Sequence, residues 1–161
     1  MSARTLVAFY SMSGKTRAIA NEIHSAIGAD IEEITEPHVR HGFGGVMRAM
    51  LDSMMRREPP IFPPNHDPST YDVLLLGGPV WAGRMAAPVR TYAKRYGTAA
   101  PHVAFFCTEG GRGAESAFAD LEKLCQHSPE ATLVVDAAHL EPEAHRAELG
   151  RFTSSVSASK H

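Results

Sequence analysis

The stretch that decides the fold is Ser11-Met12-Ser13-Gly14-Lys15-Thr16. It follows an apolar run, residues 5–10, and precedes a helix-like run, residues 17–23. The start of a helix leaves backbone N–H groups unpaired and carries a partial positive charge. Hydroxyl side chains add further donors, and a glycine lets a ligand approach the backbone closely. A strand, a hydroxyl-rich turn and a helix in this order favour a phosphate-binding loop.

Two other interpretations of this stretch compete with a phosphate-binding loop. Gly14-Lys15-Thr16 resembles the end of a nucleotide triphosphate P-loop, but that motif requires a glycine five residues before the Gly-Lys pair. Phe9 occupies that position, which excludes the P-loop. The remaining alternative is a simple capped helix without a ligand, because Ser and Thr are common N-caps.

Length and composition favour one domain with a core of its own, since the chain has 161 residues, of which 43% are hydrophobic. No apolar run approaches the roughly 20 residues that cross a bilayer, and the first residues lack the pattern of a secretory signal. We therefore expect a cytoplasmic protein that does not act at a membrane. The formal net charge of −2 gives no electrostatic reason to expect nucleic-acid binding.

The cysteines and histidines give no strong metal signal. Cys107 and Cys125 are far apart and form no CxxC pair, so we expect two reduced, largely buried thiols. His38 and His41 form an HxxH pair in a glycine-containing loop, without further ligands at suitable spacing. Metal binding is therefore not expected.

Apolar runs and helical periodicities alternate along the chain, which predicts a parallel sheet covered on both faces. Strands are expected over residues 5–10, 31–34, 71–78, 103–107 and 132–136. Helices are expected over residues 16–27, 46–57, 88–96, 115–125 and 142–152. Residues 37–67 are predicted to form an irregular insert around the second helix, with residues 42–45 near the ligand. Residues 153–161 are small and polar and are predicted to be a frayed tail.

Three unusual turns follow three of these strands: residues 11–16, a tight turn over residues 79–83, and the glycine-rich residues 107–113. In open parallel sheets, ligands bind beyond the carboxyl ends of the strands, where the strand order reverses. We therefore expect the three turns to meet in one site.

These turns carry a resemblance to the flavodoxin family that covers nearly the whole chain. It rests on the first loop, on the run Gly-Gly-Pro-Val-Trp-Ala-Gly-Arg-Met-Ala-Ala-Pro at residues 77–88, and on Thr-Glu-Gly-Gly-Arg-Gly at residues 108–113. The resemblance implies a flavodoxin-like three-layer α/β/α sandwich, with about five parallel strands in the order 2-1-3-4-5. It also implies FMN as the cofactor.

The resemblance assigns each turn a part of that cofactor. The phosphate would be held by Ser11, Met12, Ser13, Gly14, Lys15 and Thr16. The flavin ring would be flanked by Pro79, Val80, Trp81, Ala82 and Gly83. Polar contacts to the ring would come from Thr108, Glu109, Gly110, Gly111 and Gly113. Trp81 is a natural platform for a flat ring, although core packing would also explain a tryptophan in this turn.

Two features depart from familiar electron-carrier flavodoxins. The third loop contains no aromatic residue, so the other flavin face is either open to a substrate or covered by another segment, such as Phe43. The chain is nearly balanced in charge rather than strongly acidic, and Arg84 and Arg112 flank the expected site. A nearby arginine would favour an anionic reduced flavin, although Arg112 is more simply explained as a solvated loop residue.

Three functions therefore stay open. The chain can be an FMN-binding electron carrier that works with a redox partner protein. It can be an FMN-dependent NAD(P)H oxidoreductase with a quinone-like small-molecule acceptor, although no nicotinamide motif is recognisable. It can also be a cofactor-free binding module on the same fold. No catalytic acid or base is assigned, and a homodimer is possible.

Overall fold

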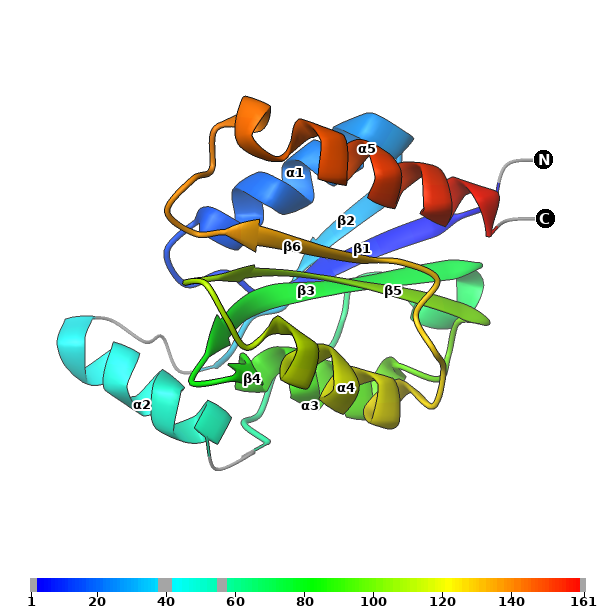
Figure 1. Cartoon of the computed structure of the whole chain (residues 1–161). Helices are drawn as coiled ribbons and strands as arrows, with labels where there is room; N and C mark the ends of the chain where they lie inside the picture. The colour runs from blue at the N-terminus through cyan, green and yellow to red at the C-terminus, as the bar shows by residue number, and fades with distance from the viewer. Residues whose placement is uncertain (1–2, 38–41, 55–57, 160–161) are drawn as a thin grey trace.

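The computed structural model describes residues 3–37, 42–54 and 58–159, and its centre is a parallel sheet (Figure 1). The sheet order is β2-β1-β3-β5-β6, and a short strand, β4, pairs antiparallel with the end of β3. The five parallel strands taken in chain order give 2-1-3-4-5, so the predicted fold class is confirmed. The strand bounds are β1 Thr5–Phe9, β2 Asp30–Glu33, β3 Val73–Trp81, β4 Arg84–Met85, β5 His102–Glu109 and β6 Thr132–Asp136.

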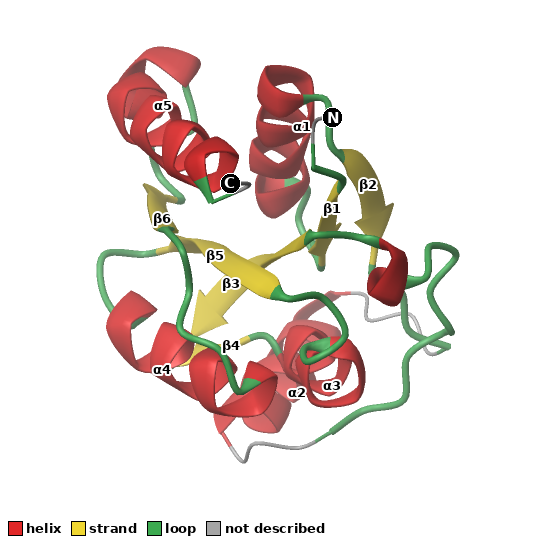
Figure 2. Ribbon diagram, turned by 90° about the vertical axis from the view of Figure 1, so that its right-hand side faces the viewer, coloured by secondary structure: helices red, strands yellow, loops and turns green. Residues whose placement is uncertain are grey.

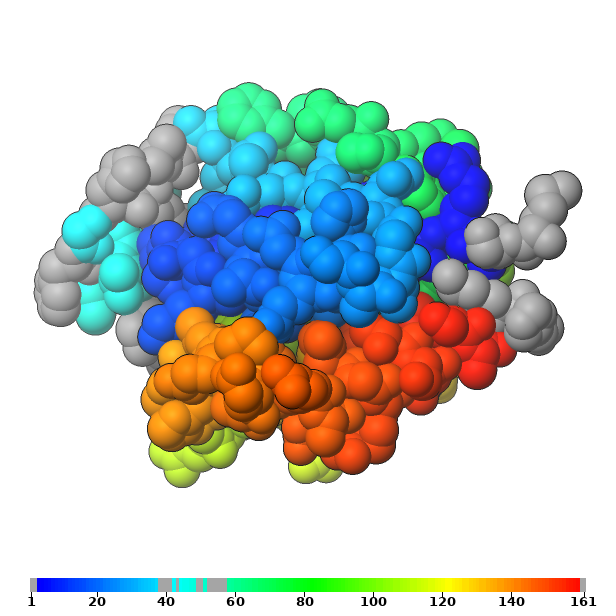
Figure 3. Space-filling model, turned by 90° about the horizontal axis from the view of Figure 1, so that it is seen from above, coloured from blue at the N-terminus to red at the C-terminus, as the bar shows by residue number. Residues whose placement is uncertain are grey.

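Helices cover both faces of the sheet. Helices α1 (Lys15–Ile27) and α5 (Pro142–Ala158) lie side by side over one face, as Figures 2 and 3 show. Helices α3 (Ala87–Tyr96) and α4 (Ala114–Cys125) cover the other. Helix α2 (Gly42–Met54) lies at one end of the molecule, near β4, and a short 3-10 turn, η1 (Pro68–Thr70), precedes β3 (Figure 1).

The central strand β3 supplies both halves of the core. Its residues Val73 to Leu76 are all apolar and do not alternate with polar residues, as expected for a strand covered on both faces. Leu74 and Leu76 pack with α3 and α4, whereas Val73 and Leu75 pack with α1 and α5. The opposite directions of successive side chains in a strand explain this division.

A close approach between β3 and β5 fixes how the two strands pack. Gly77 is paired with Phe106, and a Cβ atom at Gly77 would lie 2.2 Å from the Phe106 ring. The phenyl ring therefore occupies the space that any larger residue at this position would need.

Several element boundaries differ from the prediction. The tight turn expected over residues 79–83 is in fact a continuation of β3 to Trp81, followed by a two-residue hairpin at Ala82 and Gly83, with φ angles of 51° and 75°. Both residues at such a hairpin tip adopt positive φ, which matches the twist of the flanking strands. Helix α2 begins at Gly42, four residues before the expected start, so the predicted irregular insert contains a longer helix.

The predicted frayed tail is wrong as far as Ala158, because α5 continues to that residue. Phe152, Thr153 and Val156 are buried, and the two apolar ones pack against the same core as α1. The many small polar residues of this segment concealed one apolar stripe at helical spacing.

No helix within residues 3–37, 42–54 and 58–159 is long and apolar enough to span a bilayer. The same described parts of the chain hold no group of three His, Cys, Asp or Glu side chains arranged for a metal ion. His38 and His41 lie outside the described residues.

Candidate functional site

A cavity of about 550 Å³ lies at the carboxyl edge of the sheet and is lined by all three predicted turns. The first turn contributes Met12, Ser13, Lys15 and Thr16. The end of β3 contributes Pro79, Val80 and Trp81, and the end of β5 contributes Thr108, Glu109 and Gly110. Residues far apart in the sequence are thus brought together as the sequence predicted.

The first turn is folded around Ser11, which does not line the cavity. The Ser11 hydroxyl oxygen accepts hydrogen bonds from the N–H groups of Gly14, at 3.1 Å, and Arg17, at 3.3 Å. Gly14, with φ 91°, precedes the first residue of α1 in a left-handed conformation that favours glycine. Ser11 and Gly14 therefore shape the loop.

The start of α1 faces the cavity with unused donors. Within the described parts of the chain, the N–H groups of Lys15 and Thr16 donate to no other residue. Ser13 is exposed and lines the same cavity. Because the N-terminus of a helix also carries partial positive charge, this end of the cavity suits an anion.

A buried contact between hydroxyl groups joins the first turn to the third. Thr16 Oγ1 lies 2.9 Å from Thr108 Oγ1, and the two residues are 1% and 3% exposed. This contact holds the first turn of α1 against the end of β5. It also places two predicted site residues on one wall of the cavity.

Trp81 is carried to the cavity by the hairpin of β3 and β4. Its ring meets Tyr10 edge to face, with 6.4 Å between the ring centroids and an interplanar angle of 88°. Trp81 is half-buried and packs against the core, yet it also lines the cavity. Core packing and a platform for a ligand are therefore compatible roles for this side chain.

The hairpin tip rests on the third loop. A Cβ atom at Gly113, whose φ is 107°, would lie 2.9 Å from the Cα atom of Gly83. Both the backbone angle and this contact require glycine at position 113. Ala82, Gly83, Gly111 and Gly113 shape these two turns but do not line the cavity.

Glu109 has a structural role in the third loop. Its Oε2 atom accepts a hydrogen bond from the N–H of Ala114, at 2.8 Å, at the start of α4. Its carbonyl oxygen accepts another from the N–H of Ala137, also at 2.8 Å. The Glu109 carboxylate is thus engaged with the start of α4, although the residue lines the cavity.

The two arginines expected beside the site do not line it. The Arg84 guanidinium donates to the Ser116 hydroxyl at 3.0 Å and lies 3.8 Å from an Asp120 carboxylate oxygen, so it ties β4 to α4. Arg112 is exposed. The expectation that Arg84 flanks the site is therefore corrected.

Two elements contribute lining residues beyond the three turns. Gly42, within the segment expected near the ligand, and Val46 come from α2, and Ala137 follows β6. Val46 and Ala137 were missed. Ala137 could have been found, because the carboxyl-edge rule applies to every parallel strand of the sheet. The Phe43 side chain, which was considered as a cover, lies outside the described residues.

Cys107 precedes Thr108 but is unsuited to nucleophilic chemistry. Its side chain is fully buried, and burial together with the charge of Glu109 raises the pKa of the thiol to about 12. A thiol of this kind carries very little thiolate near neutral pH.

The family model described as Flavodoxin matches residues 4–148. The chain belongs to the flavodoxin family. The solved structures that resemble this flavodoxin-family protein include a flavoprotein from Lactobacillus acidophilus NCFM in complex with FMN. The TM-score is 0.71 at 23% identity, covering 92% of this chain and 99% of that one.

Two flavodoxin structures resemble the chain at lower scores. Oxidised flavodoxin 2 from Bacillus cereus gives a TM-score of 0.61 at 18% identity, covering 99% of this chain and 100% of that one. A flavodoxin from the domain Archaea gives 0.61 at 16% identity, covering 98% and 99%. At these identities the likeness shows the fold. No curated protein sequence matches the chain.

Proposed function

We propose that this flavodoxin-family protein binds FMN in the cavity at the carboxyl edge of the sheet and transfers electrons through it. The observation that carries the proposal is the meeting of three separate turns on one cavity of about 550 Å³. That volume lies within the range of small-molecule and cofactor sites. The FMN complex of the Lactobacillus acidophilus flavoprotein supports the choice of cofactor.

The donors at the start of α1 suit the phosphate. The N–H groups of Lys15 and Thr16 are available, and the Ser13 hydroxyl can donate as well. The exposed Lys15 ammonium adds positive charge at the mouth of the cavity. In this proposal the residues of the first turn hold the phosphate while Ser11 keeps the loop in shape.

The opposite wall suits a flat, largely apolar ring. Pro79, Val80 and Trp81 supply apolar surface, and the backbone of Gly110 offers hydrogen-bonding groups beside it. Bound FMN would supply electron transfer in one- or two-electron steps, whereas the protein sets its orientation and access to water. The acceptor would be a redox partner protein or a small molecule.

One observation favours an NAD(P)H-dependent oxidoreductase as a second candidate. Among the described side chains, α2 contributes Gly42 and the aliphatic Val46 to the cavity, and the lining residues of the third loop are not aromatic. An incompletely covered ring would leave room for a small substrate. Anaerobic mixing with NADH or NADPH tests this, because an enzyme loses its flavin absorbance rapidly whereas a pure carrier keeps it.

The main test is a titration of the flavin-free protein with FMN, followed by the quenching of flavin fluorescence. We expect saturable binding of one FMN per chain and markedly weaker binding of riboflavin, which lacks the phosphate. If neither compound binds, the cofactor-free binding module is the better description. Equal affinity for both would mean that the first turn does not hold the phosphate.

A further inference from the structure

A proline-rich segment, residues 58–67, forms a strap outside β2 and α3 (Figure 2). It is fixed to α3 by the ion pair between Glu58 and Lys94, at 2.7 Å, and by the Thr91 hydroxyl, which donates to the Pro59 carbonyl at 3.0 Å. It is fixed to the end of β2 by the N–H of Phe62, which donates to the Thr35 carbonyl at 2.9 Å. The strap therefore bridges a strand and a helix.

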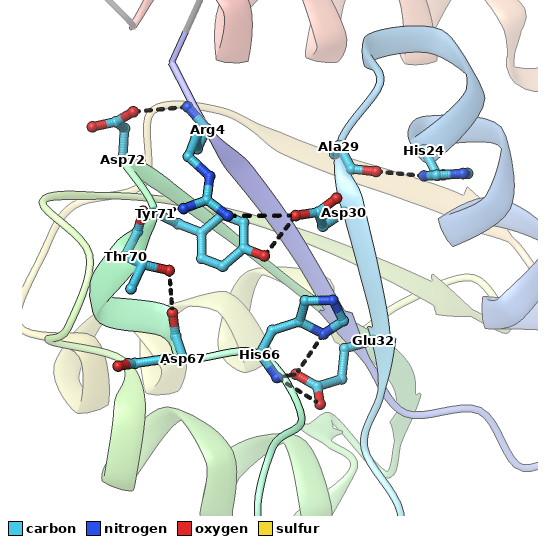
Figure 4. A network of polar contacts seen from close by, with 10 residues as sticks. All are labelled: Arg4, His24, Ala29, Asp30, Glu32, His66, Asp67, Thr70, Tyr71 and Asp72. Atoms are coloured by element: carbon cyan, nitrogen blue, oxygen red, sulfur yellow. Dashed lines mark hydrogen bonds and ion pairs between the residues drawn. The ribbon is translucent and has the colours of Figure 1, made fainter.

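Glu32 on β2 provides the third anchor. Its carboxylate accepts hydrogen bonds from the N–H groups of Asn65 and His66, and His66 Nδ1 lies 3.7 Å from Oε2 (Figure 4). The Glu32 side chain is only 5% exposed. Burying a carboxylate this deeply costs free energy unless the group is well paired. The strap supplies the N–H donors that pair with Glu32, and the Glu32 carboxylate in turn holds the strap in place.

Between these anchors the strap spans a cavity of about 500 Å³ whose described lining residues are all different from those of the proposed FMN site. Phe62, Pro63 and Pro64 form its outer wall, and Tyr92 of α3 contributes from the core side. Proline fixes its own φ angle and restricts the residue before it. The strap is therefore stiff, and the cavity exists before any ligand enters.

Tyr92, one of the residues that line this cavity, has a hydroxyl group without an assigned partner in the part of the chain that the structure describes. Tyr92 is 1% exposed, and its hydroxyl has no hydrogen-bond partner among the described residues. Glu32 and Tyr92 line the same cavity, and burial, followed by the charge of Glu32, raises the pKa of this hydroxyl. A buried hydroxyl without a partner is unfavourable, so a ligand that pairs with it would bind with an advantage.

The charges around the cavity select the kind of ligand. Glu33 is paired with Arg17 at 2.5 Å, and none of the lining residues that the structure describes is a lysine or arginine. The side-chain oxygens of Glu32 and Tyr92 can both accept hydrogen bonds. A ligand with several N–H donors and a positive charge matches this set, whereas an anion would face a buried carboxylate.

We propose that this cavity is a second ligand site, which binds a small organic ammonium compound with an apolar body. The ammonium group donates to the Glu32 carboxylate and the Tyr92 hydroxyl. The apolar body lies against Phe62, which is 53% exposed without such a cover, and the neighbouring prolines. The proposal is independent of FMN binding.

Phenethylamine, which is an ammonium ion at neutral pH, is a suitable probe. We expect saturable shifts of the backbone amide resonances of Thr35, Asn65 and His66 in a nitrogen-15-labelled sample, with a dissociation constant of about 1 mM or lower. The neutral 2-phenylethanol should bind about tenfold more weakly, and phenylacetate should not bind. No saturable shift with the amine would mean that the cavity holds water only. Equal shifts with the alcohol would mean that the cavity does not recognise the ammonium group, and either result would overturn the proposal.

Two variants locate the ammonium group. Tyr92→Phe removes only the unpartnered hydroxyl, and Glu32→Gln removes the charge while keeping an oxygen for the strap. Each should weaken phenethylamine binding about tenfold, because each removes a hydrogen bond to a charged group. Glu130→Gln, an exposed change on the loop before β6, serves as the control. Unchanged affinity in folded Tyr92→Phe and Glu32→Gln proteins would overturn the proposal, and FMN titration of the same samples reports separately on the other site.

Discussion

Thr16 Oγ1 lies 2.9 Å from Thr108 Oγ1, and this buried contact connects the start of α1 to the end of β5. Each hydroxyl satisfies the other in a place from which water is excluded. The contact therefore stabilises the fold and at the same time fixes two lining residues of the cavity beside each other.

Thr16→Val keeps the shape of the side chain but leaves the Thr108 hydroxyl buried without this partner. We expect a loss of about 1–2 kcal/mol in the free energy of unfolding, together with weaker FMN binding. Thr108→Val should cost a similar amount. The double variant should cost less than the sum of the two, because the second change removes the orphaned group. Additive losses in urea unfolding would show that the hydroxyls do not interact.

Ser13 and Ser11 separate binding from folding within the same loop. Ser13→Ala removes an exposed hydroxyl at the cavity, so FMN affinity should fall while stability stays within about 0.5 kcal/mol of the parent. Ser11→Ala removes the acceptor for two backbone N–H groups and should lower the free energy of unfolding by about 1 kcal/mol. Thermal unfolding without FMN and fluorescence titration measure the two effects. A loss of stability in Ser13→Ala together with a loss of FMN affinity alone in Ser11→Ala would contradict the roles assigned to the two serines.

Gly77→Ala places a methyl group where the Phe106 ring lies, 2.2 Å from its nearest atom. The ring belongs to a packed core and cannot move freely, so we expect a loss of about 3 kcal/mol or more in the free energy of unfolding. Gly150→Ala is the matched control, because nothing lies within 4 Å of its Cβ position in α5. That change should stabilise the protein by about 0.5–1 kcal/mol. A small effect at Gly77 would contradict the close packing of β3 against β5.

Stability should fall in alkaline solution because of the two buried thiols. Burial raises the pKa of both Cys107 and Cys125 to about 12, whereas a thiol in the unfolded chain has a pKa of about 8.5. Above about pH 8.5 the folded state therefore binds more protons than the unfolded state, and stability is lost as the pH rises towards 12. The loss approaches about 1.4 kcal/mol per pH unit for each thiol.

Urea unfolding at several pH values between about 7 and 11 measures this dependence. The Cys107→Ala and Cys125→Ala double variant is the comparison, and its stability should depend less steeply on pH over the same interval. Parallel curves for the parent and the double variant would show that the thiols are not responsible.

The sequence predicted the strands and the three turns because their signals are local. The apolar run that became β3 and the glycine-rich run after Cys107 carry their structure in a few adjacent residues. The extension of β3 to Trp81 was missed because its partner, β4, is only two residues long. The orientation of Arg84 depends on its contacts with Ser116 and Asp120 of α4, which no local pattern encodes.

The strap cavity was not predicted for a related reason. The sequence predicts an irregular insert over residues 37–67, but it does not say which surface the prolines of this insert cover. The partners Glu32 and Tyr92 come from a strand and a helix on either side of the strap in the sequence. Only the folded chain brings an orphan hydroxyl and a carboxylate together beneath it.

The continuity of β3 from the core to Trp81 has a consequence for how this protein can change over time. A one-residue shift of β3 against β5 would direct Trp81 to the opposite side and would move every core side chain of β3 to the other face of the sheet. The shift that brings Leu76 opposite Phe106 would also drive a side chain into the Phe106 ring. An error in this register thus disturbs the packing of the core together with the site. Selection for a folded molecule alone would preserve the placement of Trp81, even in a descendant that no longer needs it.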